Sequence, residues 1–190
     1  IADDVKIQVE FNPARVAEYR LIGYETRALD RADFNNDAVD AGEIGSGHSV
    51  TAIYEITAPD SPARMIEPLR YQSDDAGGDP DGEFAFLRIR YKQPGEDDSR
   101  LIEAPVTDAD LTAFAEADRE VRFAVAAAGY AQLLRGDPFL NDFAYGDVIE
   151  IAQSARGEDP FGYRAEFVQL ARLAESAAAQ AALNTGGDRE

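Results

Sequence analysis

The stretch Asp40-Ala-Gly-Glu-Ile-Gly-Ser-Gly-His-Ser-Val-Thr-Ala-Ile-Tyr-Glu-Ile56 joins a glycine-rich turn directly to an alternating apolar segment. Its three glycines allow backbone angles that residues with a Cβ avoid, and β-branched and aromatic residues follow at once. The apolar residues recur at every second position, as in a strand with one face on a core: Val50, Ala52, Tyr54 and Ile56. The stretch therefore predicts entry into a strand, and nothing in it is typical of catalysis.

The same alternation predicts strands upstream of this stretch. Residues 5–11 place Val5, Ile7, Val9 and Phe11 on one face, with Lys6, Gln8 and Glu10 facing water. Residues 16–25 are partly apolar on both faces, which indicates a central strand. Between them and the glycine-rich turn, residues 28–44 lose the periodicity, so we expect a long surface loop with at most one helical turn.

Downstream, residues 84–93 form the clearest strand, because Leu87, Ile89 and Tyr91 alternate with Arg88, Arg90 and Lys92, which we expect to be solvated. Residues 69–72 and 100–106 are further strand candidates. The aspartate- and glycine-rich residues 74–83 predict an exposed hairpin-type loop.

At Thr107 the apolar period changes from two to that of a helix. Thr107 is a candidate N-cap for a helix that reaches Gly136 and admits a break near Asp118. A second helix is predicted at residues 145–156 with Gly157 as its C-cap. A third starts at Asp159-Pro160, an N-cap followed by proline at the first helical position, and runs to about Ala182.

These elements predict an α+β fold, with an antiparallel sheet or sandwich of about six strands followed by a C-terminal bundle of three to four helices. We expect a β subdomain at residues 1–107, a helical subdomain packed on it at residues 108–183, and a disordered tail at residues 184–190.

The composition excludes several classes of partner and site. The formal net charge is −19, and acidic residues outnumber basic ones by 22 to 11 in residues 1–107 and by 15 to 7 in the rest. Such a surface repels nucleic acids and anionic membranes. Cysteine is absent, which excludes disulfides and thiolate sites. The chain has no signal peptide or membrane-spanning run and does not begin with Met, so we expect a piece of a longer protein.

One segment has the first ligand spacings of a calcium loop, in which Asp33, Asn35 and Asp37 supply alternating oxygen donors. The rest of that pattern is missing, because Ala38 replaces the turn glycine and Ile44 takes the place of the closing acid, with Glu43 one position early. We therefore favour a solvated loop and expect neither a specific divalent metal site nor a cofactor.

His48 is the single histidine, and a hydrolytic or metal-dependent site would require it to meet acids such as Asp40 and Glu43. The favoured alternative is a neutral histidine that hydrogen-bonds the glycine turn. A further aromatic group has the composition of a ligand box, although a core that joins the helices is the favoured interpretation. Its members are Phe139, Phe143, Tyr145, Phe161 and Tyr163.

Four long runs, residues 5–15, 19–25, 40–50 and 155–167, resemble the C-terminal region of bacterial YfbK-type von Willebrand factor A domain proteins. The similarity covers nearly the whole chain, and the sequence departs from the pattern at residues 74–81 and in the first half of the helix at Thr107. The residues in these runs that form a structural signature are Gly42, Gly45, Gly47, His48, Arg156, Asp159, Pro160, Phe161, Tyr163 and Arg164.

The resemblance implies a von Willebrand factor A domain upstream in the same chain, carrying a metal-dependent adhesion site. The Asp-x-Ser-x-Ser signature of that site is absent here, and Asp97-Asp98-Ser99 does not supply it. The family implies no catalytic residues for this region, and it suggests the cell envelope, on the periplasmic or extracellular side. It also implies, by analogy, a sheet with an edge that strands from elsewhere in the chain could complete.

Two classes of function are compatible with these sequence features. The favoured hypothesis is a non-enzymatic module that supports the adhesion-type domain and binds protein, with the partner unknown. The alternative is a hydrolytic or metal-dependent enzyme built on His48 with Asp40 and Glu43. An open cleft in which both acids converge on His48 would favour the enzyme.

Overall fold

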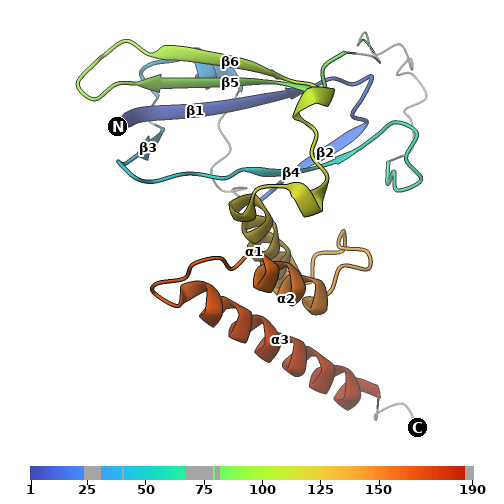
Figure 1. Cartoon of the computed structure of the whole chain (residues 1–190). Coiled ribbons are helices and arrows are strands. Elements are labelled where there is room, and N and C mark those ends of the chain that lie inside the picture. Colours follow the sequence, from blue (N-terminus) through green and yellow to red (C-terminus); the bar gives the residue numbers. More distant parts are fainter. Residues whose placement is uncertain (24–30, 40, 67–78, 80–81, 187–190) are drawn as a thin grey trace. The chain divides into compact units, whose positions relative to one another are not determined.

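The computed structural model describes residues 1–23, 31–39, 41–66, 79 and 82–186. The chain divides into two units, Ile1–Leu111 and Thr112–Glu190. Among the described residues, the first contains six strands in two antiparallel sheets and the second contains three α-helices (Figure 1), which confirms the predicted α+β class. The division follows Leu111, a few residues after the expected boundary at residue 107. The strand predicted at residues 69–72 lies outside the described residues.

The larger sheet has the strand order β3-β1-β5-β6, and all of its pairs are antiparallel (Figure 1). Its strands are β1 (Ala2–Phe11), β3 (Gly42–Ile44), β5 (Ala85–Lys92) and β6 (Arg100–Val106). β5 and β6 follow the predicted bounds closely, whereas β1 starts at Ala2, three residues before its predicted start. β3 was predicted as loop, since three residues are too few to show a period.

A bulge near the start of β1 decides which side chains face the smaller sheet. The register shifts between Asp3 and Lys6 on the β5 side, and Asp4 has a positive φ of 51°. From Lys6 onward the pairing is regular, so Ile7, Val9 and Phe11 share one face while Lys6, Gln8 and Glu10 share the other.

The smaller sheet consists of β2 (Glu18–Ile22) and β4 (Ile53–Thr57), paired antiparallel. The Phe11 ring of the larger sheet lies 4.4 Å from the Tyr19 ring and 5.4 Å from the Tyr54 ring, measured between centroids. The two sheets therefore meet at Phe11. The prediction of a central strand at residues 16–25 is wrong for the described residues, in which β2 pairs only with β4 and ends where Gly23 adopts a φ of 76°.

Residues 107–118 form no long helix, contrary to the prediction. The chain instead makes two 3₁₀ helices, η3 (Asp108–Asp110) and η4 (Phe114–Glu116). Leu111 and Ala117 are extended, with ψ of 129° and 153°, and each ends one of these turns. The break expected near Asp118 is present, because its side chain accepts a 2.7 Å hydrogen bond from the Glu120 N–H and so caps the next helix.

The α-helices are α1 (Arg119–Arg135), α2 (Tyr145–Ser154) and α3 (Tyr163–Gly186). As predicted, α1 ends at Gly136, which is left-handed with a φ of 67°. Gly157 is not the C-cap of α2, since that helix ends at Ser154 with Ala155 as its cap. α3 begins after Pro160 because Gly162, with a φ of 75°, cannot continue a helix. It extends to Gly186, beyond the predicted end, and the tail after it lies outside the described residues.

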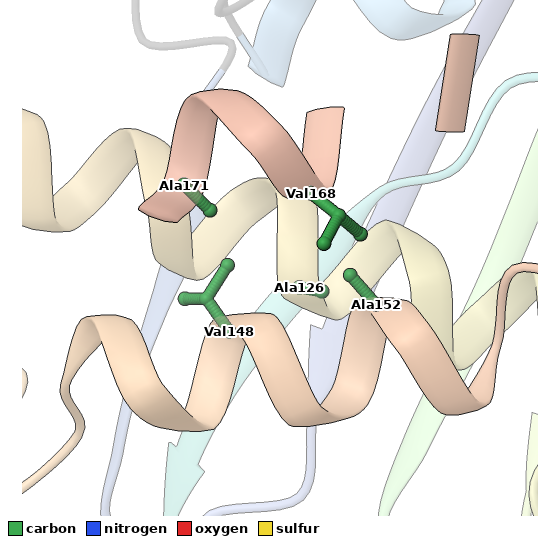
Figure 2. Packing of buried hydrophobic residues seen from close by; sticks show 5 residues of the cluster. All are labelled: Ala126, Val148, Ala152, Val168 and Ala171. Carbon is green, nitrogen blue, oxygen red and sulfur yellow. The ribbon is translucent and has the colours of Figure 1, made fainter. Parts of the chain in front are cut away.

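Small side chains form the core of the helical unit (Figure 2). Ala126 of α1, Val148 and Ala152 of α2, and Val168 and Ala171 of α3 are buried together. Complete burial of Val148 contributes about 1.5–3 kcal/mol to stability. No described helix is long and apolar enough to cross a membrane.

The aromatic residues predicted to join the helices take different positions. Phe143 packs on this core, and a Cβ at Gly129 of α1 would overlap its ring. Tyr145 meets Tyr130 edge to face at 6.2 Å. The prediction is wrong for Phe161 and Tyr163, which are 79% and 72% exposed, because the turn at Gly162 directs the chain away from the core before α3 begins.

Candidate functional site

The larger sheet has an apolar face that is only partly covered. Ile7 of β1, Ile89 of β5 and Ile102 of β6 are direct neighbours in the strand register. They lie on the same face as Phe11, which contacts the smaller sheet. Ile7 is nevertheless 47% exposed and Ile102 is 49% exposed. This row therefore faces the side of the smaller sheet and remains open to water.

The smaller sheet has matching exposed residues. Tyr19 of β2 and Ile56 of β4 are register partners and lie on the face that Tyr19 turns toward Phe11. Both are exposed large apolar side chains. We call Ile7, Ile102, Tyr19 and Ile56 the open apolar surface. It indicates a sandwich whose second layer is too narrow to cover the first.

The two halves of the edge strand β6 differ in their ability to pair with another strand. Within the described residues it pairs only with β5. Its second half contains Glu103, which pairs with Arg88 at 3.1 Å, and Pro105, which lacks an N–H. Such residues prevent edge pairing. The first half, from Arg100 to Ile102, retains its backbone donors, so it is the part of this edge that could accept another strand.

Asp33, Asn35 and Asp37, which have the spacing of calcium ligands, lie in and after η2 (Arg31–Asn35), in a loop bonded to the charged face of the larger sheet. Cations of the sheet bind this loop. Arg90 Nη2 donates to Asn35 Oδ1 at 3.1 Å, Lys92 Nζ donates to the Asp37 carbonyl at 2.8 Å, and Lys6 Nζ donates to the Asn36 carbonyl. Of the three candidate side chains, Asn35 thus binds a protein cation through its amide oxygen, and the two lysines bind backbone carbonyls of the loop.

The charged residues of this face are less solvated than predicted. Lys6 is only 3% exposed, and its Nζ binds the Asn36 carbonyl of this loop. A hydrogen bond from Ser99 lowers the pKa of Asp37, and a hydrogen bond to Asp4, 2.8 Å away, raises the pKa of Lys92. These contacts anchor the loop. The sequence pattern did not predict them because the partners lie 30 to 55 positions apart, although an amide- and acid-rich loop in a chain with alternating cations was a signal.

His48 lies at the surface of the glycine turn. Its backbone N–H donates to the Gly45 carbonyl at 3.2 Å, and its Nδ1 would lie 3.0 Å from a Cβ at Gly45, so the ring rests on that glycine. Gly47 has a φ of 77°, which explains a glycine there, whereas Gly42 is ordinary strand. His48 and Glu43 are both exposed and no hydrogen bond joins them. Asp40 lies outside the described residues, among which no three acids or histidines form a metal-binding group.

Arg164 connects the segments of the helical unit. Its guanidinium donates to both carboxylate oxygens of Glu120 on α1 and to the carbonyls of Ala155 and Arg156, at 3.2 and 3.3 Å. It also lies 4.5 Å from the centre of the Phe123 ring. The hydrogen bond from Arg164 lowers the pKa of Glu120. This signature residue therefore has a structural role.

The rest of the signature at residues 156–163 shapes the turn before α3. Asp159 Oδ2 accepts a 2.8 Å hydrogen bond from the Ala165 N–H, which lowers the pKa of Asp159. Gly157 has a φ of 61° and lies against the Arg119 guanidinium, where a Cβ would overlap it. The exposed Phe161 and Tyr163 rings stack 6.0 Å apart, beside the exposed Pro160. Asp159 and Gly157 thus account for the fold of the turn, while the ring pair contributes no buried core.

Comparison with known proteins identifies the family. Residues 1–177 match the family model described as "Uncharacterized protein YfbK, C-terminal". The chain is also 46% identical over 177 residues to the Uncharacterized protein YfbK of Escherichia coli (strain K12), an alignment that covers 92% of this chain and 30% of that protein. No solved structure is significantly similar. The domain thus corresponds to less than a third of a longer relative, and the chain belongs to the family of YfbK C-terminal domains.

Proposed function

We propose that this domain is a non-enzymatic interaction module whose open apolar surface docks another part of its parent protein. As the family resemblance implies, that part includes an upstream von Willebrand factor A domain, and the assembly works in the cell envelope. The observation that carries the proposal is the Ile7–Ile89–Ile102 row, which faces a sandwich interior and yet stays open to water.

The length of the relative supports an occupant from the same protein. The alignment covers 30% of the E. coli protein, so most of that chain is available to complete the sandwich. An added strand would gain backbone hydrogen bonds at the first half of β6 or beside the two-stranded sheet. Its alternate side chains would cover the row of isoleucines. Each half-exposed isoleucine that becomes buried would add on the order of 1 kcal/mol.

The geometry supports interaction better than hydrolysis. The ring of His48 rests on the glycine turn, with Glu43 on the neighbouring strand and no hydrogen bond between them. The calcium-like loop is bound by lysine and arginine. These contacts leave the Ile7–Ile89–Ile102 row, which is open on the side of the smaller sheet, as the surface that we assign to docking.

A pair of substitutions on one strand tests the proposal. Ile102→Lys places a charge in the isoleucine row, whereas Leu101→Lys changes the adjacent residue, 43% exposed, on the opposite face. Both side chains are already exposed to water in the isolated domain. We therefore expect each substitution to change the free energy of unfolding of the isolated domain by less than about 1 kcal/mol.

In the full-length protein we expect Ile102→Lys alone to weaken docking. Hydrogen exchange should show strong protection of β6 and β4 amides in the full-length protein and weaker protection in the isolated domain. Ile102→Lys should return the full-length protein to the weaker pattern, and Leu101→Lys should not. Equal protection of these strands in the two forms of the wild-type protein would contradict the proposal.

A further inference from the structure

A groove between α2 and α3 has the chemistry of an anion site. It encloses about 260 Å³ and is lined by Gln153 of α2, by Arg156 just after that helix, and by Ala165, Val168, Gln169 and Arg172 on α3. The four α3 residues follow the spacing of one helical stripe, so they form a continuous wall. Val168, which Figure 2 shows in the helical core, extends this core to the floor of the groove.

The two arginines of the groove are available for a ligand. Arg156 and Arg172 are exposed, and neither guanidinium forms an ion pair or hydrogen bond with the described residues. The positive charge of Arg156 interacts with Asp159 through space only. Arg164, eight residues before Arg172, differs because Glu120 and two carbonyls occupy its donors. In a chain with a net charge of −19, this groove is thus lined by two arginines and by no acidic residue.

We propose that this groove binds the C-terminal carboxylate of a peptide. Two guanidinium forks suit a single planar carboxylate, with which each can form paired hydrogen bonds. The amides of Gln153 and Gln169 offer both donors and acceptors, as required to bind the preceding peptide group. Ala165 and Val168 provide an apolar floor for a small terminal side chain. The strongly negative chain disfavours a doubly charged phosphate more than a singly charged carboxylate.

Titration of the 190-residue chain with a free-acid peptide, its amide, acetate and inorganic phosphate tests this assignment. The peptide acetyl-Ala-Ala-Val with a free carboxylate should shift the NMR signals of the Val168 methyls and of the Arg156 and Arg172 side chains in a saturable manner. The same peptide with a C-terminal amide should bind at least about tenfold more weakly, because a hydrogen bond to a charged group is lost. Acetate should bind more weakly than the free-acid peptide, since it lacks the contacts with the floor and amides.

Arginine variants assign the binding to the groove. Arg156→Gln and Arg172→Gln should each weaken binding of the free-acid peptide about tenfold, while Arg135→Gln, at the end of α1, should leave it unchanged. Equal helical circular dichroism among the variants shows that each is folded. Equal binding of acid and amide peptides, absence of saturable shifts, or tighter binding of inorganic phosphate would each overturn the proposal. If acetate bound as tightly as the free-acid peptide, the ligand would be a small carboxylic acid and not a peptide, which would also overturn the proposal.

Discussion

The helical unit has a closed core of small side chains, and the β unit leaves its isoleucine row open. Six of the nine buried apolar residues in the described part of the chain lie in the helical unit, although the β unit is the longer of the two. Neighbouring helices can form a core from contacts close in sequence, as Val148, Val168 and Ala171 do. A sheet instead requires a second layer of similar width, and β2 and β4 supply only two strands. This open row is why we propose that the β unit docks another part of its protein.

The largest expected effect comes from breaking the closed core. Val148→Asp places a carboxylate in a fully buried position, which should cost about 4 kcal/mol or more and unfold the helical unit. Val121→Asp, at an exposed position of α1, is the matched control and should cost less than about 1 kcal/mol. Urea titration followed by helical circular dichroism measures both. Similar losses in the two variants would show that the helical core is not the stable part of the chain.

A smaller effect is expected where Arg164 connects the helices. Arg164→Lys keeps the charge but loses the planar fork that reaches the carbonyls of Ala155 and Arg156, so the unfolding free energy should fall by about 1–2 kcal/mol. Glu120→Gln, which keeps those carbonyl contacts, should have a smaller effect. If the two variants lose equal stability in urea titrations, the ion pair and not the carbonyl contacts holds the segments together.

In the β unit, the glycine turn offers a more modest test. Gly47→Ala imposes a side chain on a φ of 77° and should cost about 1 kcal/mol. Gly42→Ala is the control, because its Cβ would lie 3.9 Å from the nearest atom, the Val5 carbonyl oxygen, which is ordinary contact. The midpoint of thermal unfolding measures both. If Gly42→Ala lowered the midpoint more than Gly47→Ala, a side chain would be less well tolerated in β3 than in the turn.

The parts of the fold predictable from sequence are those set by local pattern. β5 was predicted within one residue of its observed bounds because Leu87, Ile89 and Tyr91 alternate with Arg88, Arg90 and Lys92 before the turn at Gly95. The helix stop at Gly136 was likewise evident from residue type, and the break expected near Asp118 is the observed start of α1, with Asp118 and not Thr107 as its cap. The helix predicted at residues 107–118 is wrong. Its residues are good helix formers, but Leu111 and Ala117 adopt extended backbone angles that cannot be read from residue type.

The candidate site was less predictable, since it depends on contacts between distant residues. Alternation identified the apolar face of β1, but the exposure of Ile7 depends on how few strands lie opposite it. Lys6 was expected in water and is buried, and its Nζ binds a loop 30 positions away. The groove residues Arg156 and Arg172 are separated by a turn and two helical turns, and only the packing of α3 on α2 brings them together.

The smallest expected effect is a difference between the two units in how their stability depends on pH. In the helical unit, Glu120 and Asp159 have lowered pKa values because Arg164 and the Ala165 N–H bind their charged forms. A group with a lowered folded pKa stabilises the fold above its unfolded pKa and loses that contribution as pH falls through the folded value. In the β unit, hydrogen bonds from Ser99 and Arg15 lower the pKa values of Asp37 and Asp108 in the same way. Both units should therefore lose stability as the pH falls.

The alkaline side should distinguish them. The hydrogen bond to Asp4 raises the pKa of Lys92 above its ordinary 10.5, so its contribution is complete below that value and is lost as pH rises through the folded pKa. Both lysines of the chain lie in the β unit, and the cations of the helical unit are arginines, which stay charged. NMR signals of β1 and β5 should thus broaden or shift past pH 10.5 before those of α2. Lys92→Gln should remove this difference, and its persistence in that variant would mean that another group, such as Tyr54 with its burial-raised pKa, causes the alkaline loss.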